Sequence, residues 1–167
     1  MNVQFNNAYL EKLFEGRAIA GKPRYSSEVI TKFKKTILKL KYADNLREIK
    51  AQRGLNFEAL KGDFTMTMTN YKVLNSRGKE IQTDITLHPG EVLQDELEAR
   101  DIKKSFFAEQ LGMKPGHLSE LLHGRRHVSA ATALKLEKLL GIPAEYWLRV
   151  QVYYDLFVER SKEKELA

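Results

Sequence analysis

IKKSFFAEQLGMKPGHLSELLHGRR, residues 102–126, has the pattern of two short helices joined by a tight turn. Apolar side chains at helical spacing, from Phe106 to Leu111, predict the first helix over about 103–111. Gly112 follows, at a position where a left-handed helix end favours glycine. Pro115 suits the first turn of the second helix, whose leucines share one face. Helix, glycine turn and helix, followed by Arg125 and Arg126, is the pattern of a helix-turn-helix DNA reader.

Three more helices are predicted around this pair. Pro89 begins one that runs to about Ala99. Ser129 is a good N-cap for a helix that ends at Gly141, and Pro143 opens a helix rich in aromatic residues. Short connections between five helices predict an all-α domain over residues 87–160, followed by a charged tail over 161–167.

Composition limits the classes of protein that the chain can belong to. The 167 residues suit one ordinary domain or two small ones, and 43% of them are apolar. The absence of cysteine excludes disulfides, thiolate catalysis and cysteine-ligated zinc. No apolar run approaches the roughly 18–20 residues that cross a membrane, and the N-terminus lacks the features of a secretory signal. We therefore expect a cytoplasmic protein with no membrane partner.

The net charge of +6 is unevenly distributed along the chain. Residues 1–84 hold 16 Lys and Arg against 9 Asp and Glu, whereas residues 85–167 hold 12 against 13. Two halves of different charge indicate two units with different partners. The basic half would favour polyanions through phosphate contacts.

The basic half is predicted to be a small α+β segment. Val3 and Phe5 alternate with polar residues, which favours a short strand, and a helix follows over 8–14. Ser26 is a good N-cap for a helix of about sixteen residues with an apolar stripe. Its other face carries lysines between Lys32 and Lys41, which we interpret as a solvated face, with RNA or partner binding as the alternative. Residues 64–86 are expected to be a loose linker, although Tyr71, Val73 and Leu74 could form an edge strand.

Residues 1–63 resemble the first half of a HigB-type toxin of the RelE superfamily. The resemblance rests on Gly21-Lys22-Pro23, Tyr25, Val29-Ile30 before Phe33, and LNFEALKG over 55–62. It implies two helices on a small antiparallel sheet and, in complete toxins, ribosome-dependent mRNA cleavage. The resemblance stops after Asp63, before the strands that carry most cleavage residues in that family. Because residues 1–63 also contain no histidine, we expect a truncated toxin segment with no catalytic residues.

Residues 87–156 resemble the HigA/VapI-type antitoxins of the Cro/C1 helix-turn-helix class. The resemblance covers LHPGEVLQDELEARDI, FAEQLGMKPGHLSELLHGRRHVSAATALKLEKLLGIPAEYWLRVQVYYDL and the spacing between them. It implies a five-helix domain related to the lambda repressor, which binds an inverted-repeat operator as a homodimer and represses its own operon. It also implies a HigB-type toxin as a partner. No cofactor is expected.

The same resemblance assigns roles to ten residues of the DNA reader. Lys104 would contact a phosphate from the start of the first helix. The start of the second helix would enter the major groove, with Gly116 permitting close approach and His117 contacting a base edge. Glu120 would accept from cytosine N4, and the residues after the helix would hold phosphates. The full set is Lys104, Lys114, Pro115, Gly116, His117, Ser119, Glu120, His123, Arg125 and Arg126.

The sequence suggests three other kinds of site. His123 and His127 are four residues apart, but Gly124 lies between them and no ligand set is complete, so we expect no metal. The aromatic residues of the last helix could stack on bases. Their helical spacing favours a core or a dimer interface (Tyr146, Trp147, Tyr153, Tyr154 and Phe157). The acidic run from Glu91 to Asp101 is interpreted as a solvated helix face, with contact to the basic half as the alternative.

Together, these features predict a mainly α protein that acts as a sequence-specific DNA-binding antitoxin and repressor with an inactive toxin remnant. It is not expected to be an enzyme. The alternative is a self-inhibited toxin–antitoxin fusion that retains ribosome-dependent mRNA endonuclease activity. The two differ in whether residues 1–70 cleave ribosome-bound mRNA.

Overall fold

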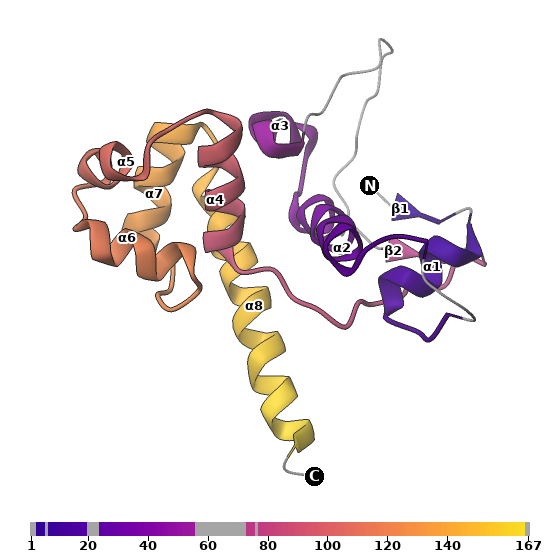
Figure 1. Cartoon of the computed structure of the whole chain (residues 1–167). Coiled ribbons are helices and arrows are strands. Elements are labelled where there is room, and N and C mark those ends of the chain that lie inside the picture. Colours follow the sequence, from indigo (N-terminus) through magenta and orange to yellow (C-terminus); the bar gives the residue numbers. More distant parts are fainter. Residues whose placement is uncertain (1–2, 6, 20–23, 56–72, 76, 166–167) are drawn as a thin grey trace. The chain divides into compact units, whose positions relative to one another are not determined.

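The computed structural model describes residues 3–5, 7–19, 24–55, 73–75 and 77–165. The chain divides into two compact units. Unit 1 comprises residues 1–45 and 64–86, and unit 2 comprises residues 46–63 and 87–167. The described residues are mainly helical (Figure 1). None of the described helices is long and apolar enough to cross a membrane.

The described part of unit 1 holds two helices and two very short strands. These are β1 (Val3–Gln4), α1 (Ala8–Glu15), α2 (Ser27–Tyr42) and β2 (Val73–Leu74). Ser26 caps α2 through its hydroxyl oxygen, as predicted, and α2 spans 16 residues. The two described strands run parallel, with Val3 opposite Val73, whereas the toxin resemblance implies an antiparallel sheet. A RelE-like fold for this segment therefore stays a proposal.

The core of unit 1 joins the start of the chain to residues 73–81. Phe5, Phe14, Val73 and Ile81 are buried together, and the rings of Phe5 and Phe14 lie 5.5 Å apart. Ile81 donates its backbone N–H to the Val73 carbonyl. Val73 and Ile81 thus belong to the core of unit 1, where the sequence favoured a loose linker. The physical reason is that Val73 and Ile81 supply apolar cover that β1 and the helices of unit 1 lack by themselves.

The lysines of α2 do not form one solvated face. Lys32 is exposed, but Lys34 and Lys39 are buried. The Lys34 ammonium group forms an ion pair with the Asp84 carboxylate. The solvated-face interpretation is therefore wrong for Lys34 and Lys39. The sequence pattern alone could not show this, because Asp84 lies 50 residues further along the chain.

Unit 2 contains all five helices predicted over residues 87–160. They are α4 (Pro89–Ala99), α5 (Lys104–Leu111), α6 (Pro115–Leu122), α7 (Ala130–Leu140) and α8 (Ala144–Glu165). The last helix continues to Glu165, so most of the expected charged tail is helical. Unit 2 also contains α3 (Leu46–Ala51) and the 3-10 turn η1 (Arg53–Leu55), which belong to the toxin-like stretch of the sequence.

The core of unit 2 contains leucines and the aromatic rings of Phe107, Tyr146 and Trp147. Trp147 and Tyr146 are fully buried, and their rings meet edge to face at 6.0 Å. The Trp147 indole N–H donates to the Ile142 carbonyl. The core interpretation of the aromatic set is confirmed for these two residues, whereas Tyr153 is 45% exposed.

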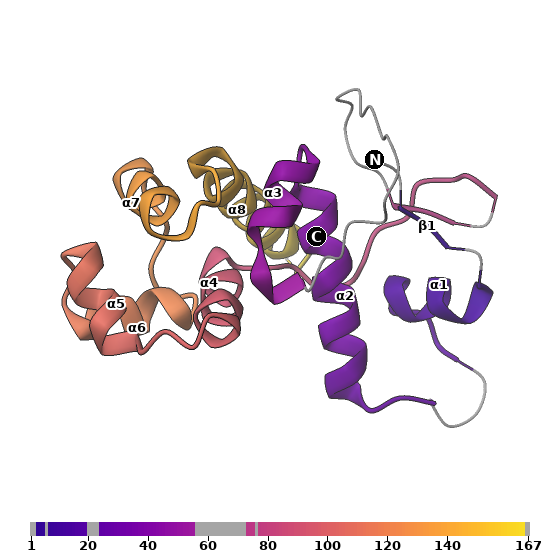
Figure 2. The same ribbon diagram turned by 90° about the horizontal axis from the view of Figure 1, so that it is seen from above.

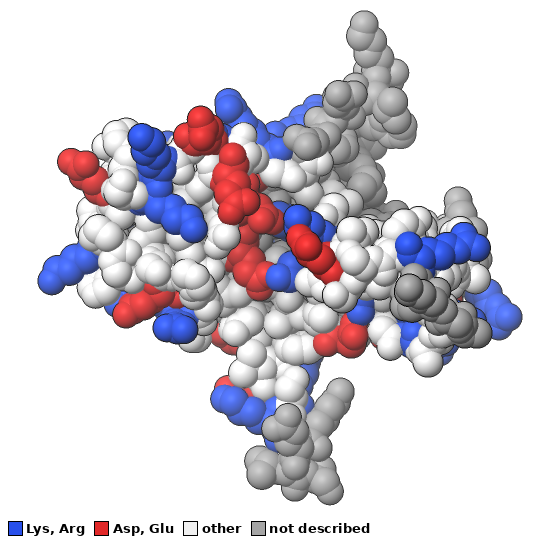
Figure 3. All heavy atoms as spheres, in the orientation of Figure 1, with Lys and Arg blue, Asp and Glu red and all other residues white. Residues whose placement is uncertain are grey.

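The acidic run of α4 is only partly solvated. Acidic side chains gather over α4 on the face seen in Figure 3. Asp95 and Glu98 are exposed, but Glu96 is fully buried. The solvated-face interpretation is therefore wrong for Glu96. Its carboxylate is buried because it accepts hydrogen bonds from the Arg100 side chain and from the backbone N–H groups of Arg53 and Gly54.

His88 fixes the start of α4. Its ring is buried edge-on against Tyr154, and Nδ1 accepts the backbone N–H of Gly90 at 2.9 Å. The Glu91 carboxylate in turn accepts the N–H of His88, which completes a capping box. Burial lowers the pKa of His88 below its ordinary value of 6.5; Glu91 and Asp155 oppose this shift, and His127 adds to it.

Unit 2 should lose stability in mild acid because of His88. The unfolded chain binds a proton near pH 6.5, whereas folded His88 resists it, so the free energy of unfolding should fall as the pH drops below about 6.5. The slope contributed by one such group is at most about 1.4 kcal/mol per pH unit. Urea unfolding between pH 5 and 8 measures it. The control is His88→Asn, which keeps a capping acceptor; an unchanged slope in this variant would contradict the assignment.

Candidate nucleic-acid interface

The two helices of residues 102–126, α5 and α6, pack side by side, and α4 packs against α6 (Figure 2). Gly112 ends α5 with φ of 63°, in the left-handed region that the sequence predicts for it. The chain then turns through Met113 to Lys114, which is the N-cap of α6. Pro115 occupies the first turn of α6, as predicted. The geometry is that of a helix-turn-helix.

The turn places one face of α6 in the core and the other in solvent. Leu118, Leu121 and Leu122 are buried. All the residues of α6 that the sequence assigns to DNA reading are exposed (Pro115, Gly116, His117, Ser119 and Glu120). The same is true of Lys104, Lys114, His123 and Arg125, whereas Arg126 is half-buried.

A close contact between α4 and α6 sets the position of the reading helix. A Cβ atom added to Gly90 would lie 1.8 Å from the Leu121 carbonyl oxygen. The backbone of α4 therefore approaches the end of α6 more closely than any side chain would allow. Because Gly90 also donates its N–H to His88, the start of α4 is held from both sides.

The start of each reading helix has no side-chain cap. Lys103 and Lys114 are the N-caps of α5 and α6, and neither makes a capping hydrogen bond. The other described helices of eight or more residues each receive a side-chain acceptor at their start, from Asn7, Ser26, His88, Ser129 and Glu137. A lysine at a helix N-terminus is also opposed by the helix dipole. An anion placed there would relieve both features, because it would accept the free N–H groups and neutralise the lysine.

The predicted cations of the site differ in their pairing. Lys104, Lys114 and Arg125 form no ion pair with another described residue. Arg126 donates from Nε to the Glu120 carboxylate at 3.2 Å, and both side chains are nearly half exposed. Such an exposed pair contributes at most about 1 kcal/mol and can open for a ligand. Glu120 and Arg126 therefore neutralise each other in the free protein, which leaves three unpaired cations.

His123 is engaged with its own helix. Its Nδ1 lies 2.7 Å from the Ser119 carbonyl oxygen. Since a carbonyl can only accept, Nδ1 carries the proton, and in the neutral ring Nε2 is an acceptor. A neutral His123 therefore offers no donor to a phosphate, although the imidazolium form would. The phosphate role assigned to His123 from the sequence requires that charged form.

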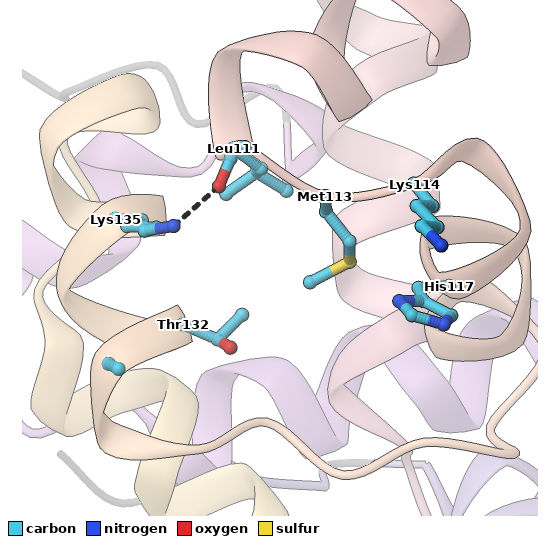
Figure 4. Close-up of a pocket in the computed structure, with 8 residues that line it drawn as sticks. Leu111, Met113, Lys114, His117, Thr132 and Lys135 are labelled. Carbon is cyan, nitrogen blue, oxygen red and sulfur yellow. Dashed lines mark hydrogen bonds between the residues drawn. The ribbon is translucent and has the colours of Figure 1, made fainter.

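An open groove of about 370 Å³ lies beside the start of α6. Figure 4 shows Lys114 and His117 on one side of it and Thr132 and Lys135 of α7 on the other. The Lys135 ammonium group donates to the Leu111 carbonyl at 2.7 Å and so caps the end of α5. The sequence did not predict that α7 forms a wall of this groove. No local signal could have revealed it, because Lys135 lies 24 residues from Leu111.

The four histidines do not converge. His88 is a buried helix cap, whereas His117, His123 and His127 are exposed. Within the part of the chain that the structure describes, no three His, Asp or Glu side chains are grouped so that they could hold a metal ion.

The helix-turn-helix region is similar to known proteins. A helix-turn-helix family model matches residues 93–147. The chain is 34% identical over 79 residues to virulence-associated protein I of Dichelobacter nodosus, which covers 46% of this chain and 73% of that protein. It is 35% identical over 79 residues to antitoxin HigA-1 of Vibrio cholerae, covering 47% of this chain and 74% of that one. A solved structure of Pseudomonas aeruginosa antitoxin HigA with the higBA promoter is 26% identical, with a TM-score of 0.46 over 49% of this chain and 90% of that chain.

Proposed function

The chain belongs to the HigA-type antitoxins with a Cro/C1-type helix-turn-helix domain, and on this premise we propose that it is a sequence-specific DNA-binding repressor of its own toxin–antitoxin operon. In this proposal α6 is the recognition helix, and the N-termini of α5 and α6 bind backbone phosphates. The ten residues assigned from the sequence form the DNA-binding surface. A toxin remnant precedes the repressor.

One observation supports this proposal most strongly. Both reading helices begin with an exposed lysine and free backbone N–H groups, whereas the other long helices described are capped by side chains. Folding alone does not favour this arrangement, since a capping Ser, Thr or Asp at the same position would stabilise each helix by about 1 kcal/mol. Two phosphate groups of DNA would supply the missing acceptors.

His117 and Arg125 should affect DNA binding in different ways. His117→Ala should weaken binding to the operator more than to random duplex, because the exposed imidazole can hydrogen-bond a base edge. Arg125→Ala should weaken both about equally and reduce the salt slope by about 1, because it contacts phosphate. Fluorescence anisotropy with both duplexes over a salt series measures the two effects. Unchanged affinity in both variants would show that neither residue belongs to the DNA-contacting surface.

Gly116→Ala is expected to raise stability and to lower DNA affinity. A Cβ atom at Gly116 would meet nothing within 4 Å, so the fold itself has no need of glycine there. Gly116→Ala should raise the free energy of unfolding by up to about 1 kcal/mol, since alanine is the better helix former. It should at the same time weaken operator binding, because the added methyl group stands where DNA approaches. A variant that is more stable and binds as tightly as the parent would contradict the close approach.

Homodimerisation on an inverted repeat is part of the proposal. Apolar side chains remain exposed in the middle of α8, where Val152 is 55% and Leu156 43% exposed. A two-fold pair of recognition helices about one turn of DNA apart would read the two half-sites. The exposed apolar stripe supports a dimer because it would otherwise lie in water.

The alternative endonuclease function has no supporting arrangement in the described part of unit 1. Its described residues contain no histidine, and Lys34 is held by Asp84. A ribosome-dependent mRNA cleavage assay on residues 1–70, run beside the purified full chain, tests this, because a self-inhibited fusion would be silent as the full chain. We expect no cleavage, and robust cleavage would favour the fusion enzyme.

A further inference from the structure

The surface of unit 2 formed by α4 and α8 holds α3 and η1, which come from the toxin-like part of the sequence (Figures 1 and 2). We infer that this surface, the α4–α8 surface, is a docking site for a toxin that presents the same helix and turn, and that the chain's own α3 and η1 occupy it. The inference rests on the proposed antitoxin function for the kind of partner. The contacts themselves are independent of DNA binding.

The α4–α8 surface recognises the backbone of its occupant. Glu96 accepts the N–H groups of Arg53 at 3.1 Å and Gly54 at 2.9 Å. Arg100 donates from Nε to the same carboxylate and from Nη2 to the Ala51 carbonyl at 2.8 Å. One buried acid and one arginine thus bind three backbone groups at and just after the end of α3. A Cβ atom at Gly54 would lie only 3.2 Å from the Glu96 carboxylate, so the position favours glycine.

Three side chains of the occupant are also recognised. Arg149 of α8 donates to Glu48 at 2.7 Å, and this carboxylate is only 4% exposed. The Tyr146 hydroxyl donates to the Gln52 side-chain carbonyl at 3.2 Å, between two buried residues. Ile49 is completely buried. The site therefore selects a short helix and turn with the pattern Glu-Ile-x-x-Gln-x-Gly.

The chemistry of these contacts is that of an interface between partners. The domain contributes ionic and hydrogen-bonding groups, whereas α5, α6 and α7 bury mainly apolar side chains. If α3 left, Glu96 and Arg100 would still pair with each other and would be hydrated. Three of the four receptor residues, Glu96, Arg100 and Tyr146, lie inside the span that matches the helix-turn-helix family, and the occupant lies outside it. The family domain therefore binds a toxin-like segment through polar pairs. In our inference this is the toxin-docking surface of an antitoxin, and a segment of the same chain fills it.

A charge swap in the full chain tests this. Glu48→Arg should release the segment, because two arginines would then face each other in a buried contact. The probe is a fluorescein-labelled synthetic peptide of residues 45–55. The parent chain should not bind it, because its site is filled. The Glu48→Arg chain should bind it, and should bind the Gly54→Ala peptide more weakly.

The reciprocal variant is the matched control. The Arg149→Glu chain should bind a peptide that carries Glu48→Arg. It should bind the parent peptide at least about a hundredfold more weakly than that matching peptide. The double variant with both changes should close the site again and bind neither peptide. All three variants should keep their DNA affinity, so failure here leaves the repressor proposal standing.

Three results would overturn the inference. The first is that neither opened chain binds its matching peptide at up to about 1 mM. The second is that the parent and opened chains bind the peptide equally. The third is that both single variants fail to fold by circular dichroism, since α3 and η1 would then be part of the domain core.

Discussion

Replacing Lys104, Lys114 and Arg125 together with alanine is expected to weaken DNA binding about a hundredfold at physiological salt. These three cations are exposed and have no described ion-pair partner in the free protein. Each phosphate contact contributes about 0.9 to the salt slope, which amounts to roughly fivefold in affinity near 0.15 M. Because the cations lie at the ends of the reading helices, the three contributions should add.

Anisotropy titrations over a salt series measure this effect as a slope reduced by about 3. The matched control removes three cations of unit 2 that lie on α3 and α8, outside the helix-turn-helix, through Lys50→Ala, Arg160→Ala and Lys162→Ala. All three are exposed, and Lys162 forms only an exposed pair with Glu159. Equal losses in both triple variants would mean that net charge, and not the helix-turn-helix face, determines DNA affinity.

Replacing Gly90 with alanine is expected to destabilise unit 2 by at least about 3 kcal/mol. The added methyl carbon would lie 1.8 Å from the Leu121 carbonyl oxygen and 2.9 Å from His88 Nδ1. Backbone atoms of α6 cannot rotate away as a flexible side chain would, so α4 and α6 must separate. This loss is a large share of the roughly 5–15 kcal/mol that holds a domain folded.

Urea unfolding followed by circular dichroism measures the Gly90 effect. Gly116→Ala is the control, since it makes the same chemical change on the neighbouring helix in open space. DNA affinity should fall with Gly90→Ala even where the variant is folded, because Leu121 belongs to the recognition helix. Equal stability of the two variants would contradict the close packing of α4 on α6.

The helices of unit 2 could be predicted because their ends are encoded locally. Proline at the starts of α4 and α6, serine before α7 and glycine after α5 and α7 act within one or two residues of each helix end. The exposed residues of α6 also followed from the spacing of its buried leucines. Their individual roles at DNA remain predictions.

The contacts that could not be predicted join residues far apart in the chain. Glu96 was predicted to be one of several solvated acids. It binds instead the backbone N–H groups of Arg53 and Gly54, which lie more than 40 positions earlier in the chain. Its spacing from Val92 and Leu93 was the available hint, because it falls on the same buried side of α4. The ion pair between Lys34 and Asp84 could not be predicted for the same reason. The boundary between the two halves follows from such long-range pairs, which is why α3 was assigned to the toxin-like segment alone.

A nuclease footprint of the purified chain on the DNA upstream of its own coding sequence tests the repressor proposal most directly. The proposal predicts two protected half-sites in an inverted repeat, with centres about one helical turn apart. It also predicts that the Lys104, Lys114 and Arg125 triple variant gives no protection at the same concentration. Uniform protection along the upstream DNA, with random duplex bound equally well, would contradict a sequence-specific repressor.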